Sequence, residues 1–253
     1  MRFGVLLPAL GLVAALVTGC SSGDVGRKPG EPVTQQDAAA LAGLLHRNYV
    51  HAGADFVVTA PYGQDTVLTL TGEVDFRHEI GHARAVTSFG DGRADDVRTI
   101  VFTSEELWVG DVPGLPEALA ADGVPGAVYL HRALAGGEAS ATPPLVDAVL
   151  EVLLNLSART ADEPRSFLGA GYTWQGQRSI DSRLTSLFGL RDGRTVAVDA
   201  SDDLLTQFVT RLADTKHDVT VTLSDHRART LPTPDPAQGT ETADHPDLAE
   251  FGL

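Results

Sequence analysis

The sequence predicts an α+β fold, and three features of its middle section support this class. Residues 66–77 alternate apolar and polar side chains with a period of two, as a half-buried strand does. Several similar runs follow, separated only by short turn sequences such as Gly90-Asp91-Gly92, which favours antiparallel pairing. Segments of helical periodicity stand among them without forming repeating strand–helix–strand units.

Residues 34–49 open the fold with an amphipathic helix. Thr34 is a good N-cap, and Asp37 three positions later completes a capping-box pattern. Apolar residues then recur at helical spacing, at Leu41, Leu44, Leu45 and Tyr49. A second, short helix is expected at residues 116–121.

A long helix is predicted at residues 144–159, PLVDAVLEVLLNLSAR. Its proline suits a first helical turn. Its apolar residues cover well over half of the helical wheel, so the helix should be buried on more than one side.

A fourth helix is expected after Ser201, an N-cap candidate followed by the acidic pair Asp202-Asp203. One stripe of this helix would hold the apolar residues Leu204, Leu205, Phe208, Val209 and Leu212.

Strands account for most of the remaining chain. Within residues 66–77, four apolar side chains should share one face: Leu68, Leu70, Val74 and Phe76. Further strands are expected at residues 82–89, 97–103, 107–109, 172–175, 179–188, 195–199 and 219–223.

The N-terminal segment has the features of an export signal. Arg2 precedes an apolar run over residues 3–17, which is short for a membrane span of ~20 residues and fits a signal peptide. The run ends in Val17-Thr18-Gly19-Cys20, which resembles a bacterial lipobox. That resemblance implies a signal peptide at residues 1–19, cleavage before Cys20 and a diacylglyceryl group on its sulfur.

Cys20 is also the single cysteine of the chain, so an exported form has no internal disulfide to make. The alternative is an ordinary secretory signal followed by a chance cysteine. We expect lipidation, which would place the protein on the extracytoplasmic side of the cell membrane, anchored through Cys20.

Two flanking segments have little to bury. Residues 20–33 are rich in Gly, Ser and Pro and predict a flexible tether. Residues 232–253 combine prolines and acidic residues without an apolar period, which predicts a disordered tail. Residues 34–231 are then expected to form one α+β domain.

Composition and motifs argue against several functions. The formal net charge is −15, only Lys28 and Lys216 are lysines, and no basic patch with interleaved aromatics occurs, so nucleic-acid binding is not expected. There is no P-loop, no G-x-G-x-x-G and no G-x-S-x-G. We therefore expect no cofactor and no catalytic residue.

One motif, by contrast, is typical of a catalytic zinc site. His78-Glu79-Ile80-Gly81-His82 reads H-E-x-x-H, which on a helix places two histidines on zinc and a glutamate on the attacking water. The residues before it have period two and include Gly72, which disfavours a helix. A third ligand would also be needed, and Glu117 is the best candidate, with His131 weaker. We expect instead a β-hairpin with its turn at residues 78–81, in which Gly81 supplies a positive φ.

The chain also resembles a known family over residues 66–232. The resemblance lies in TGEVDFRHEIGHARAV, in the strand ending LWVG, in the helix PPLVDAVLEVLLNLSA and in DVTVTLSDHRARTLP. These segments look like those of actinobacterial lipoproteins of the LppX/LprG type and their LolA/LolB-like relatives. The resemblance implies a strongly curved antiparallel half-barrel with helices across its concave face, and an apolar cavity between them for acyl chains. It assigns no ligand-contacting residue.

The function expected from these observations is that of a monomeric envelope lipoprotein that binds a lipid or other hydrophobic ligand without catalysis. Two alternatives remain. One is an accessory or adaptor lipoprotein with a filled core, and the other is a zinc metallopeptidase built on His78, Glu79 and His82.

Overall fold

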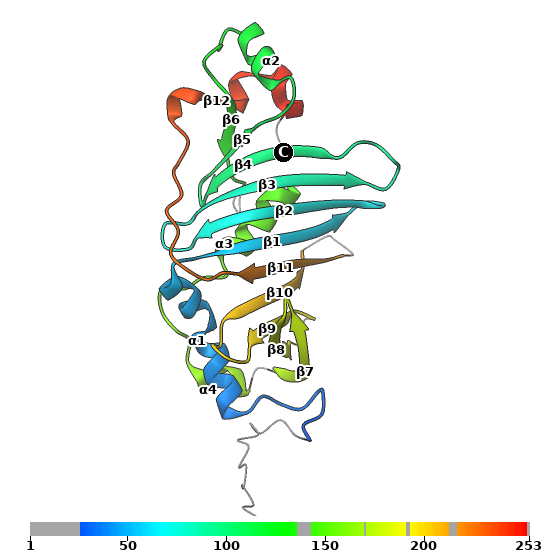
Figure 1. Ribbon diagram of the computed structural model, residues 1–253, viewed down its shortest axis with the longest axis vertical. Helices are drawn as coiled ribbons and strands as arrows, with labels where there is room; N and C mark the ends of the chain where they lie inside the picture. The colour runs from blue at the N-terminus through cyan, green and yellow to red at the C-terminus, as the bar shows by residue number, and fades with distance from the viewer. Residues whose placement is uncertain (1–25, 136–142, 170, 191–192, 213–216, 252–253) are drawn as a thin grey trace, which may run out of the picture.

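The described residues form one curved, unclosed sheet, with one helix laid across a face and the others at its side and ends (Figure 1). The computed structural model describes residues 26–135, 143–169, 171–190, 193–212 and 217–251. Within these residues the sheet has twelve strands in the order β12-β6-β5-β4-β3-β2-β1-β11-β10-β9-β8-β7. Neighbouring strands are antiparallel except β12 and β6, which are parallel. The α+β class and the curved sheet are therefore confirmed.

The strands follow one another mostly as hairpins. Their bounds are β1 Gly53–Tyr62, β2 Thr66–Asp75, β3 Ile80–Phe89, β4 Asp96–Thr103, β5 Glu106–Gly110, β6 Tyr129–Ala133, β7 Thr173–Ile180, β8 Arg183–Gly189, β9 Thr195–Asp199, β10 Leu205–Arg211, β11 Asp218–Ser224 and β12 Gly239–Glu241. β1 lies at the middle of the sheet and pairs with β2 and β11, which joins the two halves.

Four α-helices accompany the sheet in the described residues: α1 Gln35–His51, α2 Leu115–Ala121, α3 Leu145–Leu154 and α4 Pro164–Leu168. The predicted capping box is present, with the Asp37 N–H donating to the Thr34 hydroxyl and the Thr34 N–H donating to the Asp37 carboxylate. None of these helices is long and apolar enough to cross a bilayer.

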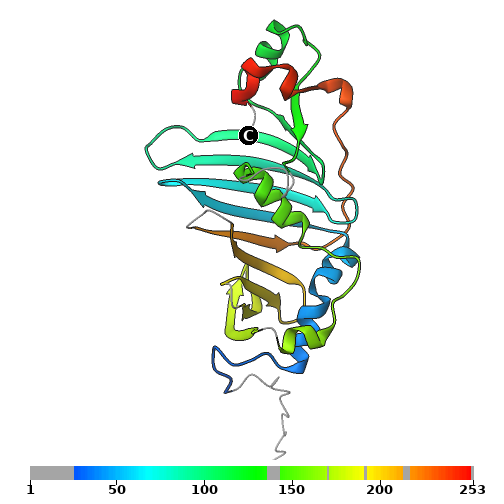
Figure 2. The ribbon, with the colours of Figure 1, turned by 180° about the vertical axis from the view of Figure 1, so that it is seen from behind.

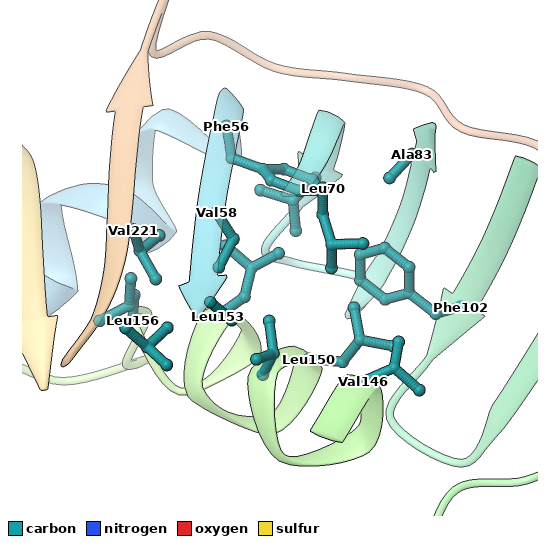
Figure 3. Packing of buried hydrophobic residues seen from close by; sticks show 14 of the residues in the cluster. Phe56, Val58, Leu70, Ala83, Phe102, Val146, Leu150, Leu153, Leu156 and Val221 are labelled. Atoms are coloured by element: carbon teal, nitrogen blue, oxygen red, sulfur yellow. The ribbon is translucent and has the colours of Figure 1, made fainter. Parts of the chain in front are cut away.

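α3 lies across the sheet and fills its centre, as seen from behind in Figure 2. Its side chains Val146, Leu150 and Leu153 meet those of Phe56, Leu70 and neighbouring strand residues (Figure 3). Leu150 and Leu153 are fully buried. The expected burial of this helix on more than one side is observed, although it ends at Leu154 and does not reach residue 159.

The prediction of a helix after Ser201 is wrong. The segment forms β10, which pairs with β9 on one side and β11 on the other. The apolar spacing of Leu205 and Phe208 fits a strand because a bulge between Leu205 and Gln207 shifts the register. Asp202-Asp203 lies in the β9–β10 turn, where Asp203 has a φ of 57°.

The prediction of a single strand at residues 179–188 is also wrong, because this segment contains the end of β7, a turn and most of β8. Asp181 and Ser182 have φ values of 47° and 65° and form a tight turn between β7 and β8. Two successive positive φ values match the twist of a two-residue hairpin.

The described parts of both flanking segments are more ordered than their composition predicts. Residues 30–33 hydrogen-bond to the β7 edge, so the described part of the expected tether is docked. The expected disordered tail is wrong for the described residues of this segment, which form β12 and three 3-10 helices, η1 Pro236–Gln238, η2 Thr242–Asp244 and η3 Pro246–Phe251. Leu248 is buried in the main core, which supplies the apolar contact that the composition concealed.

Candidate functional site

The H-E-x-x-H segment belongs to a β-hairpin, as predicted, and not to a zinc helix, but the turn spans residues 76–79 instead of the expected 78–81. β2 ends at Asp75 and β3 begins at Ile80, with Asp75 paired to Ile80. The two histidines have separate partners. The His78 Nδ1 lies 2.8 Å from an Asp75 carboxylate oxygen, and the His82 Nε2 lies 2.6 Å from the Pro232 carbonyl oxygen.

The proposed third ligands lie elsewhere. Glu117 is on α2, and the His131 ring stacks on Trp108 with 4.2 Å between ring centroids. In the part of the chain that the structure describes, no three His, Cys, Asp or Glu side chains are grouped as metal ligands.

Gly81 has a different role from the one predicted. The positive φ of the turn belongs to Glu79, at 54°, so Gly81 is not needed for the turn conformation. Gly81 instead lies in β3 opposite Phe102 of β4. A Cβ at position 81 would lie 2.1 Å from the Phe102 ring, so the glycine leaves space for that ring in the core.

Cys20, the predicted lipidation site, lies outside the described residues. Its role therefore stays a prediction from the sequence.

A mostly apolar cavity of about 340 Å³ lies between the helices and one half of the sheet. The middle of α1, the end of α3, and α4 form one wall, and β9 and β10 form the other. Its lining is mostly apolar: Leu41, Leu44, Leu45, Val152, Leu156, Phe167, Tyr172, Leu190, Val196, Leu205 and Phe208, with the polar residues Asn155, Asp162, Arg194 and Thr210. This volume lies near the lower end of the ~300–1,000 Å³ typical of small-ligand sites.

The cavity lies beside the end of α3 and not beneath its middle. The space beneath the middle of α3 is filled by side chains, as Figure 3 shows for Leu150 and Leu153 against Val58 and Val221. Only Val152, at the end of the helix, and the two lining residues just after it face the open space. The half of the sheet made by β7 to β10 is thus the half that contains a site.

The segment that follows α3 is fixed to α1 by backbone hydrogen bonds. The Ala158 N–H donates to the Leu45 carbonyl at 3.1 Å, and the Asp162 N–H donates to the Ala42 carbonyl at 2.9 Å. The buried Asn48 side chain donates to the Leu156 carbonyl at 2.7 Å. These bonds hold the cavity wall in place without filling the cavity.

α4 lines the cavity next to this segment. Phe167 and Tyr172 pack with ring centroids 4.9 Å apart, and both line the cavity. α4 has only five residues and no fully buried side chain, so it is a thin part of the wall.

A second cavity of about 330 Å³ lies beside the start of α1 and is mostly polar. Burial alone would raise the pKa of Asp37, but hydrogen bonds from Arg27 and Thr34 outweigh it and hold the pKa below its ordinary value. Burial also acts against the ionisation of Asp199, where hydrogen bonds from Ser201 and the charge of Arg183 lower the pKa. Because both carboxylates already have donors within the fold, this cavity is a structural polar cluster.

One histidine beside the end of α1 carries a strong pKa shift. Burial lowers the pKa of His226 to about 4, and the positive charges of Arg183 and His51 act in the same direction. The His226 and His51 rings lie edge to face, with 6.3 Å between their centroids. His226 is therefore neutral at physiological pH.

The family resemblance implied a cavity between sheet and helices but named no residue of it. Its wall residues are far apart in the chain, and β10 was taken for a helix, so their common location was hidden. The signal that was available is the concentration of leucines in residues 41–45, more than α1 needs for a single contact stripe.

Comparisons with known proteins concern the fold. No family model matches the chain, and no curated protein matches it. Among solved structures, the chain is similar to LprF from Mycobacterium bovis, with 14% identity and a TM-score of 0.46 over 81% of this chain and 99% of that one. It is also similar to an uncharacterized conserved protein from Thermus thermophilus, with 10% identity and a TM-score of 0.38 over 81% of this chain and 98% of that one. Any function has to be inferred from the cavity itself.

Proposed function

We propose that this protein is a lipid-anchored envelope lipoprotein that binds one hydrophobic ligand in the cavity between α1, α4 and β9–β10. The mostly apolar lining of that cavity is the observation that carries the proposal. The anchor is the diacylglyceryl group expected on Cys20, which places the domain on the extracytoplasmic side of the membrane.

The cavity favours a ligand with one acyl chain or a compact apolar body. Its volume of about 340 Å³ is small among ligand sites, so several long chains would not fit without movement of the wall. Each methylene transferred from water into it contributes roughly 0.8 kcal/mol, before the cost of ordering the ligand. Asp162, Arg194 and Thr210 lie among the lining residues and can meet a polar head group.

The proposed activity is binding and carriage without catalysis. The short α4, which has no buried side chain, is the part of the wall best suited to reversible entry and release, because the segment before it is hydrogen-bonded to α1. We propose a monomer as the working unit.

Organic extraction of the native purified protein tests the proposal. Mass spectrometry of the extract should show a non-covalent lipid at about one molecule per chain, and the delipidated protein should bind a fluorescent fatty acid. An extract free of lipid, together with no fatty-acid binding, would contradict the carrier function and favour the accessory alternative.

A further inference from the structure

The segment that follows the expected anchor is docked on the edge of the sheet. The Gly30 N–H donates to the Trp174 carbonyl at 2.7 Å, and the Trp174 N–H donates to the Glu31 carbonyl at 2.8 Å. Pro32 forms a β-bridge with Thr173. Strand β7 is the last strand of the sheet, so this segment covers an edge that would otherwise be open.

A side-chain clamp secures the same segment. The Arg27 guanidinium lies over the Trp174 ring, 5.0 Å from its centroid, and makes a 2.7 Å ion pair with Asp37. Arg27 also donates to the Pro32 carbonyl. Because Asp37 also belongs to the capping box of α1, the clamp ties this segment to both the helix and the sheet.

The clamp leaves little chain between the domain and Cys20. Residue 26 begins the described chain, and only six residue steps separate it from Cys20. Six residues span at most about 20 Å when fully extended. The head-group layer on one side of a bilayer takes about 5–8 Å of that length.

The docked segment lies at the same end of the molecule as the thin cavity wall. Figures 1 and 2 place the start of the described chain beside α4 and β7, at one end of the long axis, and α2 and β12 at the other. Leu168 of α4 is 44% exposed there, while its neighbour Phe167 lines the cavity. An exposed leucine thus stands directly outside the wall of the apolar site.

We propose that the docked segment and the short leader hold the α4 end of the domain against the membrane, so that Leu168 contacts the lipid surface and the cavity exchanges its ligand through α4. The partner of this surface is the bilayer. The proposal rests on the lipid anchor in the proposed function, and it adds the orientation of the domain and the route of the ligand.

Site-specific fluorescence on the full lipidated protein tests this orientation. Once Cys20 is acylated the chain has no free thiol, so Leu168→Cys provides a unique site for a nitrobenzoxadiazole label. Val128→Cys is the matched control, because Val128 is 43% exposed and directly precedes β6 at the other end of the sheet. The proteins are placed in phosphatidylcholine vesicles that contain a doxyl-labelled lipid, since a chain of net charge −15 is poorly suited to anionic lipid.

We expect the lipid quencher to reduce emission at least threefold for the label at position 168 and to leave the label at position 128 unchanged. Equal quenching of both labels, or of neither, in protein that floats with the vesicles would overturn the orientation while leaving the anchor intact. Protein that does not float would overturn both the anchor and this inference.

A lengthened leader provides the second test. Twenty Gly/Ser residues inserted between Ser22 and Gly23 should remove most of the quenching at position 168, while the lipid content of the purified protein stays at one molecule per chain. Unchanged quenching would show that α4 reaches the bilayer by its own affinity, which contradicts the role of the short leader.

Discussion

Gly81→Ala in the H-E-x-x-H hairpin tests whether this glycine is required for space or for turn conformation. The new Cβ would lie 2.1, 2.6 and 2.7 Å from three Phe102 ring atoms. Phe102 is fully buried and packs edge-on against Phe56 at 6.2 Å, so its ring has little room to retreat. Overpacking of this kind costs about 1–3 kcal/mol, and replacing a strand glycine returns about 0.5–1 kcal/mol. We expect a net loss of up to about 2.5 kcal/mol.

A double-mutant cycle with Phe102→Ala isolates that cause. Phe102→Ala alone should cost about 3–5 kcal/mol. With the ring gone, Gly81→Ala should become neutral or slightly stabilising, because nothing remains for its Cβ to meet. Gly72→Ala is the matched control, since its Cβ would lie 1.9 Å from the His82 carbonyl oxygen, a backbone clash that Phe102→Ala cannot relieve.

Urea unfolding of the unchanged protein, the two single variants and their combination gives the free energies of the cycle, and Gly72→Ala with and without Phe102→Ala gives the control. If Gly81→Ala costs the same with and without Phe102, to within about 0.5 kcal/mol, the two residues are uncoupled and the steric explanation is refuted.

Three further perturbations test the surrounding structure. The pKa of His226 is about 4 in the folded protein and 6.5 in the reference state, so the unfolded chain binds the proton first as the pH falls. The stabilising contribution of neutral His226 should therefore be full above pH 6.5. The free energy of unfolding should fall by about 2 kcal/mol between pH 6.5 and 4, after allowance for partial exposure of the side chain. His226→Gln should flatten that part of a urea-derived stability profile, and an unchanged slope would assign it to other groups. Leu150→Ala should cost about 3–5 kcal/mol in the same assay, and a cost below about 1 kcal/mol would mean that α3 does not pack as described. Asp147→Ala removes both carboxylate oxygens that accept hydrogen bonds from Arg132 at 2.8 and 2.6 Å. The midpoint of thermal unfolding should fall by an amount equivalent to about 2–4 kcal/mol. A shift equivalent to less than about 1 kcal/mol would mean that this ion pair does not secure α3.

Local sequence patterns correctly predicted the elements that are determined by residues close together in the chain. The period-two alternation of residues 66–77 identified β2, and its four predicted inward residues, from Leu68 to Phe76, are all buried. The Thr34–Asp37 pair located the start of α1. Both signals depend on contacts within a few residues.

The predictions that were wrong concern elements determined by contacts between residues far apart in the chain. β10 has helical apolar spacing, and only its pairing with β9 and β11 with a bulge makes it a strand. The tail is polar and proline-rich, yet Leu248 reaches the core. The family resemblance implied a cavity between sheet and helices but gave none of its residues, because its walls come together only through the sheet.

Ligand titration of two variants of one helix tests the central claim most directly. Leu45→Trp adds bulk at the cavity wall, and Val50→Trp adds the same bulk at a position of α1 that is 51% exposed and does not line the cavity. Fluorescent fatty-acid titration of the delipidated protein should show affinity reduced at least tenfold in Leu45→Trp, about 1.4 kcal/mol, and unchanged in Val50→Trp. Equal affinity in both variants and the unchanged protein would place the ligand elsewhere and contradict the account.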